Sequence, residues 1–291
     1  MSQYHIPKRT KNIYDPGDSK PFKISRAKMD LYINCPKCFY MDRRLGVDRP
    51  KGFPFTLNSA VDKLLKKEFD LLRKDGKAHP LIEKYGVDAV PVWHEMLDEW
   101  RGKFKGVKCL HEPTNLIITG ETDDLWRNSA GEYIVVDYKA TSKNEEITEL
   151  NKEWQNSYKR QMDVYQWLLR RNGLKVSNTG YLIYCNGNTG LEKFDGKLEF
   201  DLTLITYEGS DNWVEDKIKE IHACLQQDQI PPASKTCDYC NYREAVEEVT
   251  LHLKRIEGTE STIDIPFLPA KLPFTQKIQK ELKEFRTFIR L

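Results

Sequence analysis

The chain has 291 residues, of which 39% are hydrophobic, and this is sufficient for a real core in one large domain or two. Its 46 lysines and arginines nearly cancel its 44 aspartates and glutamates, giving a formal net charge of only +2, so no global basic field indicates a nucleic-acid ligand. The N-terminus lacks an apolar signal core and no apolar run approaches the roughly 18 residues of a membrane span, which predicts a cytoplasmic protein without membrane contact.

The N-terminal segment predicts a surface arm followed by a short helix. The first 24 residues are polar and are interrupted by residues that disfavour regular structure, Pro7, Pro16, Gly17 and Pro21. Ser25 then stands where it can cap a short helix. This helix leads into Cys35 and Cys38, a C-x-x-C pair that two aromatic residues follow.

A longer helix is predicted over residues 55–73. Apolar residues recur there on one face, which we expect to be buried: Leu57, Val61, Leu64, Leu65, Phe69 and Leu72. Asp62 borders this stripe, although Glu68 lies nearer its centre. Residues 91–105 predict a further helix, whose aromatic stripe indicates core packing rather than base stacking.

Residues 120–139 predict a β-hairpin, because two runs rich in Ile, Val, Tyr and Trp flank an Asn-Ser-Ala-Gly turn at 128–131. Strand side chains alternate, so Asp137 and Lys139 point to the same side, and the hairpin brings Asp123 roughly opposite Asp137. Two carboxylates and one ammonium can hold a hard divalent cation and orient a water for phosphodiester hydrolysis. A bare Asp-x-Lys also occurs as a solvated surface ion pair.

The segment 152–171 predicts an amphipathic helix with its apolar stripe at Trp154, Tyr158, Met162, Tyr165, Leu168 and Leu169. Gln161 falls within this stripe, four residues before Tyr165, so an amide and a phenol share one face. Burying them without partners would cost roughly 1 to 3 kcal/mol each. We therefore expect a polar site beneath this helix.

The remainder of the chain indicates an α/β fold. Strands are predicted near residues 179–185 and 198–207, then a helix over 211–227, and this alternation predicts a central mixed sheet flanked by helices. The segment from residue 263 contains three prolines and then a basic amphipathic helix over 274–291. That helix can pack on the protein or contact DNA or a protein partner.

A second C-x-x-C pair, Cys237 and Cys240, lies almost 200 residues after the first. In a reducing compartment two such pairs indicate metal ligands rather than disulfides. Four thiolates suit either a [4Fe–4S] cluster or structural zinc, and the spacing does not choose between them. We expect a metal clasp that joins the N- and C-terminal segments; four unligated thiols are the alternative.

Three motifs, in this order and at these separations, carry a resemblance to a known family: Gly120-x-x-Asp123, Asp137-Tyr138-Lys139 and Gln161-x-x-x-Tyr165. They resemble the PD-(D/E)xK nucleases, over residues 25–244. The pattern is similar to the RecB-type branch, which includes the nuclease domains of recombination helicase–nucleases and the CRISPR-associated adaptation exonuclease. The resemblance implies a restriction-endonuclease-like core.

The resemblance also implies roles for these residues. Asp123, Asp137 and the carbonyl of Tyr138 are expected to hold Mg²⁺ or Mn²⁺, and Lys139 is expected to position the attacking water. Gln161 and Tyr165 are then expected to orient Lys139 or the scissile phosphate, as their counterparts do in the family.

Two positions depart from the family pattern. A metal-ligating histidine of the family corresponds here to Asp62, which can still ligate but favours harder, oxygen-only binding over a strict manganese preference. Iron–sulfur relatives usually contribute one cysteine from the N-terminal segment and three from the C-terminal one, whereas this chain has two and two. A [4Fe–4S] cluster is expected on the resemblance, with zinc as the alternative.

The sequence thus predicts a metal-dependent DNA nuclease with three parts: a polar arm over residues 1–24, a nuclease domain with the cysteine clasp over 25–262, and a Pro-rich segment with a basic helix over 263–291. The relatives imply cutting, as by an exonuclease, at single strands or DNA ends. Two alternatives are a nucleic-acid-binding module that keeps the fold without cleaving, and a ribonuclease with the same metal chemistry.

Overall fold

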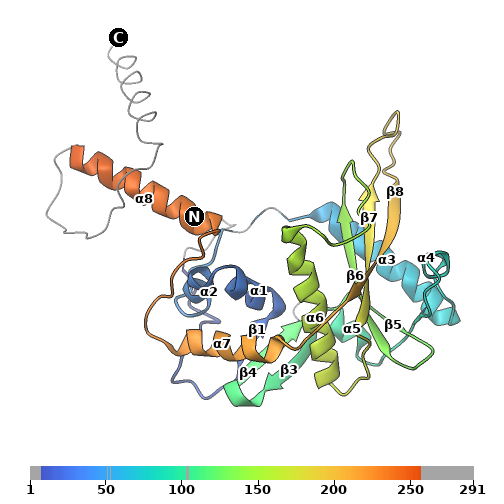
Figure 1. Cartoon of the computed structure of the whole chain (residues 1–291), viewed down its shortest axis with the longest axis horizontal. Coiled ribbons are helices and arrows are strands. Elements are labelled where there is room, and N and C mark those ends of the chain that lie inside the picture. The colour runs from blue at the N-terminus through green and yellow to red at the C-terminus, as the bar shows by residue number, and fades with distance from the viewer. Residues whose placement is uncertain (1–7, 51, 53, 103–104, 257–291) are drawn as a thin grey trace, which may run out of the picture. The chain divides into compact units, whose positions relative to one another are not determined.

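The computed structural model describes residues 8–50, 52, 54–102 and 105–256 (Figure 1). They divide into a large compact unit that ends at Asn241 and a second unit that begins at Tyr242. Helix α8 (Asp238–Ile256) begins in the first unit and supplies the described part of the second. The expected Pro-rich segment and basic helix of residues 263–291 lie outside the described residues.

Two sheets form the framework of the large unit. The larger has the strand order β2 (Val90–Pro91), β5 (Asp124–Arg127), β6 (Tyr133–Thr141), β7 (Thr179–Gly187) and β8 (Phe200–Glu208). Strands β6 and β7 run parallel, while the other neighbours are antiparallel. The smaller sheet places β4 (Leu116–Gly120) between β1 (Phe22–Ser25), which is parallel to it, and β3 (Val107–His111), which is antiparallel.

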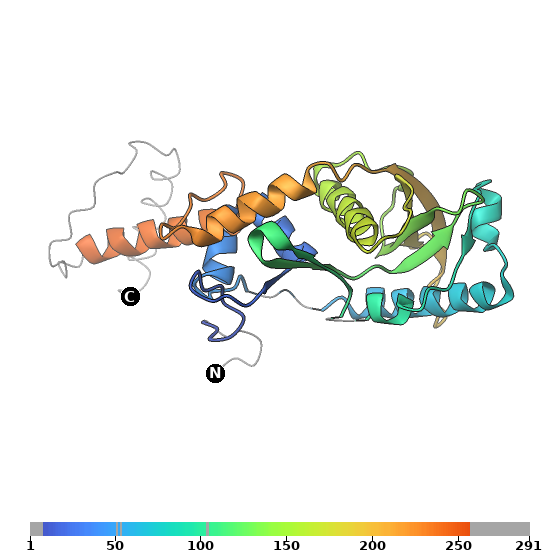
Figure 2. The ribbon, with the colours of Figure 1, turned by 90° about the horizontal axis from the view of Figure 1, so that it is seen from below.

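Helices cover both faces of the larger sheet, because the strands bury side chains on both sides. Ile134, Val136 and Tyr138 of β6 pack in a core with α3 (Thr56–Asp75) and α4 (Pro80–Lys84). Val135 of the same strand belongs to another core, with α6 (Asn156–Arg171). Figure 2 shows α3 and α6 on opposite sides of the sheet. The predicted α/β fold, with mixed sheets flanked by helices, is confirmed.

The second core also contains three helices from the two ends of the large unit: α1 (Arg26–Asn34), α2 (Pro36–Arg43) and α7 (Val214–Gln226). Short helical segments complete the unit: α5 (Leu97–Trp100) and the 3₁₀ turns η1 (Glu112–Thr114) and η2 (Glu153–Gln155). In the described part of the chain, no helix combines the length and apolar character that a membrane span requires.

The expected burial of α3 is wrong for Leu57 and Leu64. Leu57 and Leu64 are more than half exposed, whereas Leu65 and Phe69 are buried. The helix contacts β2 and β6, and only side chains that point toward these strands are removed from water. Because the adjacent residues Leu64 and Leu65 differ in burial, helical periodicity gives the direction of the buried face but not its width.

The predicted helix over residues 91–105 is also wrong. Pro91 belongs to the edge strand β2, which pairs with β5 alone, and a proline is tolerated at an edge because its missing N–H faces no partner strand. Among the described residues of this region, only α5 is helical. Trp93 is half exposed, and the guanidinium of Arg73 lies 5.3 Å from its ring centroid.

Candidate active site

The β5–β6 hairpin positions the candidate catalytic carboxylates. Asp124 pairs with Val136, so Asp123 stands just before the strand at the level of Asp137. The backbone N–H of Tyr138 donates a hydrogen bond to Asp123 Oδ2 at 3.0 Å, which fixes this carboxylate against β6. The register of this hairpin thus brings Asp123 and Asp137 together.

Lys139 and Asp137 lie on the same face of β6 and form an ion pair. The Lys139 ammonium is also 4.6 Å from the centroid of the Tyr158 ring, a distance typical of a cation–π interaction. These contacts come from two directions, the strand and helix α6. The ammonium is therefore held in one place above the sheet.

Gln161 of α6 connects the groups of this site. Its Nε2 donates to Asp137 Oδ1 at 2.7 Å and to the Tyr165 hydroxyl at 2.8 Å, while its Oε1 accepts from Lys139 Nζ at 3.2 Å. The polar site that the buried glutamine predicted does lie beneath the helix. One amide thereby fixes the orientation of a carboxylate, an ammonium and a phenol.

Gly120 has a steric reason to be a glycine. A Cβ at this position would lie 2.6 Å from Tyr165 Cε1 and 3.0 Å from a methyl carbon of Leu168. Contacts this short with a buried ring and a packed leucine would displace α6. The glycine that precedes Asp123 by three residues therefore lets the helix that carries Gln161 approach the end of β4.

Asp137 is the most buried acid of the site, with 1% of its surface exposed. Burial raises its pKa to about 6, against the opposing charge of Lys139. Arg26, at the start of α1, also opposes this rise. Asp137 Oδ2 lies against the Lys139 ammonium without hydrogen-bond geometry, so it accepts no hydrogen bond. A buried carboxylate oxygen that accepts no hydrogen bond and already faces a positive charge is suited to a cation.

A second lysine, which the sequence interpretation missed, lies between Asp62 and Asp123. Lys66 Nζ is 2.8 Å from Asp62 Oδ1 and 3.0 Å from Asp123 Oδ1. Burial, and then the charge of Asp123, raise the pKa of Asp62. The four-residue spacing of Asp62 and Lys66 was the available signal. Helix α3 is held over this site in part by Asn58, whose Nδ2 donates to the carbonyl of Ala140 at 2.7 Å.

A buried ion cluster supports the hairpin from the other face. Asp124 is fully buried and pairs with Arg73 and with Arg101, whose Nη2 is 2.7 Å from Asp124 Oδ1. The Tyr138 hydroxyl donates to Asp124 Oδ2 at 2.8 Å, and Arg101 Nε donates to the carbonyl of Asp123 at 3.1 Å. This cluster, also missed from the sequence, fixes the backbone on which Asp123 stands.

The carboxylates suit an ion that needs few protein ligands. Among the described residues, only the four cysteines form a group of three or more potential ligands whose atoms all lie within 4.8 Å of one another. Asp62, Asp123 and Asp137 are more widely spaced, and Mg²⁺ typically takes one or two protein carboxylates and keeps several waters. The Oδ2 atom of Asp137, which accepts no hydrogen bond, and the nearby carboxylate of Asp123 can supply these one or two ligands.

The predicted cysteines Cys35, Cys38, Cys237 and Cys240 lie together in the large unit, away from the carboxylates. The other cysteines of the chain are outside this group: Cys109, Cys185 and Cys224. Burial raises the pKa of the Cys185 thiol to about 12, which keeps it protonated and unreactive.

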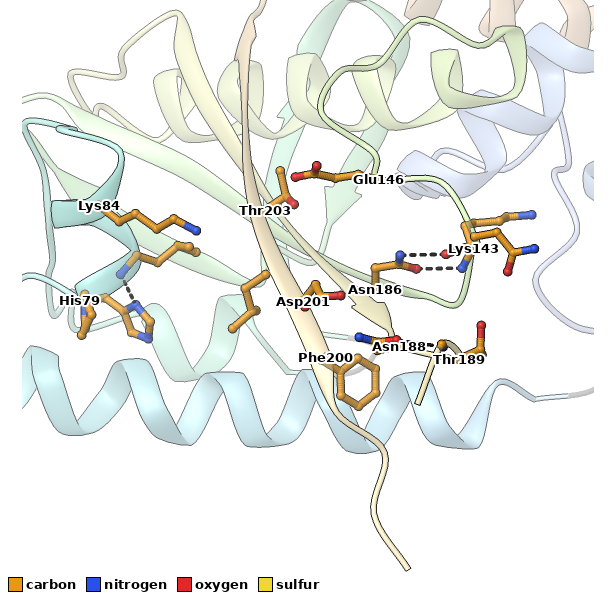
Figure 3. A pocket seen from close by; sticks show the side chains of 15 residues that line it. His79, Lys84, Lys143, Glu146, Asn186, Asn188, Thr189, Phe200, Asp201 and Thr203 are labelled. Carbon is orange, nitrogen blue, oxygen red and sulfur yellow. Dashed lines mark hydrogen bonds between the residues drawn. The ribbon is translucent and has the colours of Figure 1, made fainter. Parts of the chain in front are cut away.

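A surface pocket of about 940 Å³ lies elsewhere, between α4 and the ends of β6, β7 and β8 (Figure 3). One wall is fixed by Asn186, which accepts from the backbone N–H of Lys143 at 2.7 Å and donates to its carbonyl at 2.9 Å. His79 and Asp201 also line it. None of the carboxylates described above contributes to this pocket. The candidate active site is thus defined by its chemistry and not by a large cavity.

The site combines a mixed sheet, a hairpin that carries two acids and a helix that carries a glutamine. This arrangement suits a metal-dependent phosphodiesterase. A model of the PD-(D/E)XK nuclease superfamily matches residues 57–245, more than half of the chain, and the protein belongs to this superfamily. The match includes Asp62, Asp123, Asp137, Lys139 and Gln161 but not the first cysteine pair. No curated protein matches the chain.

Proposed function

We propose that this protein is a divalent-metal-dependent DNA nuclease of the RecB-type branch, which cuts single strands or DNA ends. The observation that carries the proposal is the buried carboxylate of Asp137, whose Oδ1 accepts a hydrogen bond from Gln161 while its Oδ2 faces the Lys139 ammonium and accepts no hydrogen bond. The membership of the nuclease superfamily supports the reaction class, phosphodiester hydrolysis.

Asp123 and Asp137 would hold Mg²⁺ or Mn²⁺, with the carbonyl of Tyr138 and the carboxylate of Asp62 as further ligands. Such an ion supplies Lewis-acid polarisation of the phosphoryl oxygen and a lower pKa for a bound water. Asp123 is suited to this role because its Oδ2 is already positioned by the N–H of Tyr138. Asp62 shares the Lys66 ammonium with Asp123, which already offsets part of its charge, and its contribution is therefore the smaller one.

Lys139 positions the water that attacks phosphorus. Its ammonium is held by Asp137, Gln161 and the face of Tyr158, which leaves little freedom to its orientation. A fixed donor beside the nucleophile lowers the entropic cost of reaching the transition state. The attack forms a new P–O bond from water, and the departing nucleotide oxygen takes a proton as the old P–O bond breaks.

Gln161 and Tyr165 hold this arrangement together rather than react. Gln161 accepts from the lysine and donates to the carboxylate, so it keeps the two at a constant separation. Burial raises the pKa of Tyr165, so its hydroxyl stays protonated and neutral beside the acid. Support of this kind typically changes metal affinity or activity by about 10- to 100-fold when it is removed.

The test uses the full chain with labelled single-stranded DNA, duplex DNA with free or blocked ends, and RNA, each with Mg²⁺, Mn²⁺ or chelator. We expect metal-dependent cleavage of DNA that needs a single strand or a free end. Cleavage of RNA alone would indicate a ribonuclease, and binding without cleavage would indicate a non-cleaving module; either result would overturn the proposal. Cleavage that persists in Asp137→Asn would show that the activity comes from a contaminating nuclease or another site.

A matched control for Asp137→Asn is Asp201→Asn, which removes the same charge from an exposed position on β8. This variant should cleave like the wild type. A third variant, Asp62→Asn, should reduce cleavage by less than Asp137→Asn because Lys66 already offsets part of the charge of Asp62.

A further inference from the structure

The four clustered cysteines stand at the starts of two helices. Cys35 is the residue between α1 and α2, and Cys38 lies in the first turn of α2. Cys237 directly precedes α8, and Cys240 lies in its first turn. The two C-x-x-C pairs therefore present their sulfurs in the same local geometry, and the fold brings the two helix starts face to face.

The sulfur atoms form one group of four rather than two bonded pairs. Cys38 Sγ is 3.6 Å from Cys237 Sγ and 3.5 Å from Cys240 Sγ, while Cys35 Sγ is 3.8 Å from Cys240 Sγ. Cys38 thus has two equivalent neighbours across the group, and all four cysteines are free thiols. A disulfide would require a single partner at about 2 Å.

These separations discriminate between the two metal centres that four thiolates can hold. A tetrahedral zinc ion with Zn–S bonds of about 2.3 Å places its sulfurs about 3.8 Å apart. Cysteines that ligate the four corners of a [4Fe–4S] cluster stand on the order of 6 Å apart, since iron atoms and an iron–iron edge lie between them. All four sulfurs here lie within 4.8 Å of one another, which is too close for the cluster.

The surroundings of the sulfurs also suit a closed ion site. Cys35, Cys237 and Cys240 are buried. Arg49 Nη2 donates to Cys237 Sγ at 3.2 Å, and the guanidinium of Arg49 lies 4.6 Å from the ring centroid of Tyr239. A zinc ion with four thiolates carries a net charge of −2, and a neighbouring arginine offsets part of it.

We propose that Cys35, Cys38, Cys237 and Cys240 bind a single tetrahedral zinc ion, and not the [4Fe–4S] cluster that the resemblance to iron–sulfur relatives implies. Four protein ligands fill the tetrahedron and leave no open position, so the site is structural. The ion joins the start of α8 to α2 by ligating Cys38 and Cys237, which are 199 positions apart in the chain. It has no part in the hydrolysis, and the inference stands or falls independently of the proposed nuclease activity.

The first experiment measures metal content without any substrate. The full chain is produced in cells supplied with both iron and zinc, purified without oxygen, and assayed for zinc, iron and acid-labile sulfide. We expect about one zinc per chain and colourless protein. Brown protein with iron and sulfide would overturn the proposal in favour of the cluster, and protein without either metal would show that the cysteines bind none.

Two further measurements locate the ion. Titration of the wild type with a thiol reagent should release the zinc as the clustered cysteines react, and release before any thiol reacts would place the zinc elsewhere. Cys237→Ser should lose most of the zinc, while Cys109→Ser, which alters a half-buried cysteine of β3, should keep it. Replacement of zinc by Co²⁺ should give the intense visible absorption of a tetrahedral thiolate site, and its absence would contradict four-sulfur ligation.

Discussion

The carboxylate site and the cysteine site are built in opposite ways. Asp123, Asp137, Lys139 and Gln161 come from one hairpin and the helix that follows it, and α3 completes the site. The cysteines come from the two ends of the large unit, and Cys38 and Cys237 are 199 positions apart in the chain. The first site is arranged by secondary structure, and the second exists only when the whole unit is folded.

This difference predicts different consequences of damage. The carboxylate site is supported by a hairpin register, by Gln161 and by the Asp124 cluster, so the loss of one acid should leave the fold in place. The cysteine site closes a very long loop, and the ion that closes it contributes free energy to folding directly. Activity should therefore report on the first site and stability on the second.

The largest effect is expected for Asp137→Asn. The amide keeps the shape of the carboxylate but removes the charge that a divalent ion requires, so cleavage should fall by about 10³-fold or more. The melting temperature should change little, because the relief of burying a charge with a raised pKa offsets the loss of the ion pair with Lys139. Single-turnover cleavage and thermal unfolding of the same preparation would test both statements, and a large loss of stability would contradict the comparison.

Cys237→Ser should have the next largest effect, and it should act on stability. With one zinc ligand removed, we expect the melting temperature to fall by at least about 5 °C, which for a chain of this size corresponds to a few kcal/mol. Cleavage measured well below the new midpoint should fall by less than about tenfold, since the carboxylate site is untouched. If the variant were as stable as the wild type, the metal clasp would not contribute to the stability of the fold.

Gln161→Ala is expected to reduce cleavage by about 10- to 100-fold, less than Asp137→Asn, because it removes orientation and not a ligand. Gln166→Ala is a matched control on the same helix. Gln166 is buried and its Nε2 donates to the carbonyls of Ser177 and Asn178, so this change should cost stability and spare cleavage. A loss in Gln161→Ala equal to that of Asp137→Asn would identify Gln161 as a direct participant.

The smallest effect is expected for Arg49→Gln, which weakens the surroundings of the cysteines and leaves all four in place. Loss of the hydrogen bond to Cys237 should lower the melting temperature by roughly 2 to 6 °C, with zinc retained and cleavage unchanged. Arg44→Gln is the comparison, because the guanidinium of Arg44 forms an ion pair with the exposed Asp228 at 3.7 Å and not with a cysteine of the metal site. Equal effects of the two changes would show that Arg49 has no special relation to the metal site.

Local patterns in the sequence were sufficient for the hairpin and for the helix of Gln161. Period-two alternation puts Asp137 and Lys139 on one side of β6, and the helical period puts Gln161 on the face that meets them. These relations depend on the geometry of one strand and one helix. The periods of the strand and the helix therefore place these side chains without help from distant segments of the chain.

The burial along α3 and the basic residues around the hairpin depended on how α3 and α5 pack against the strands. The helical period of α3 marks Leu57 and Leu64 as readily as Leu65, yet only the last is buried, because it packs in the core formed with the strands beneath the helix. Lys66, Arg73 and Arg101 look like ordinary surface residues in the sequence, and only the packing of α3 and α5 against the hairpin brings them to Asp123 and Asp124.

The sequence by itself determined the class of this protein, because the motifs within one hairpin and one helix resemble those of the nuclease superfamily, whose family model matches residues 57–245. It also determined that two C-x-x-C pairs exist, but not what they bind, because four thiolates serve zinc and iron alike. That choice depends on the distance between sulfurs 199 and 202 residues apart in the chain. Only the tertiary structure decides such a distance, because the distance depends on how all the elements between the two cysteine pairs pack together.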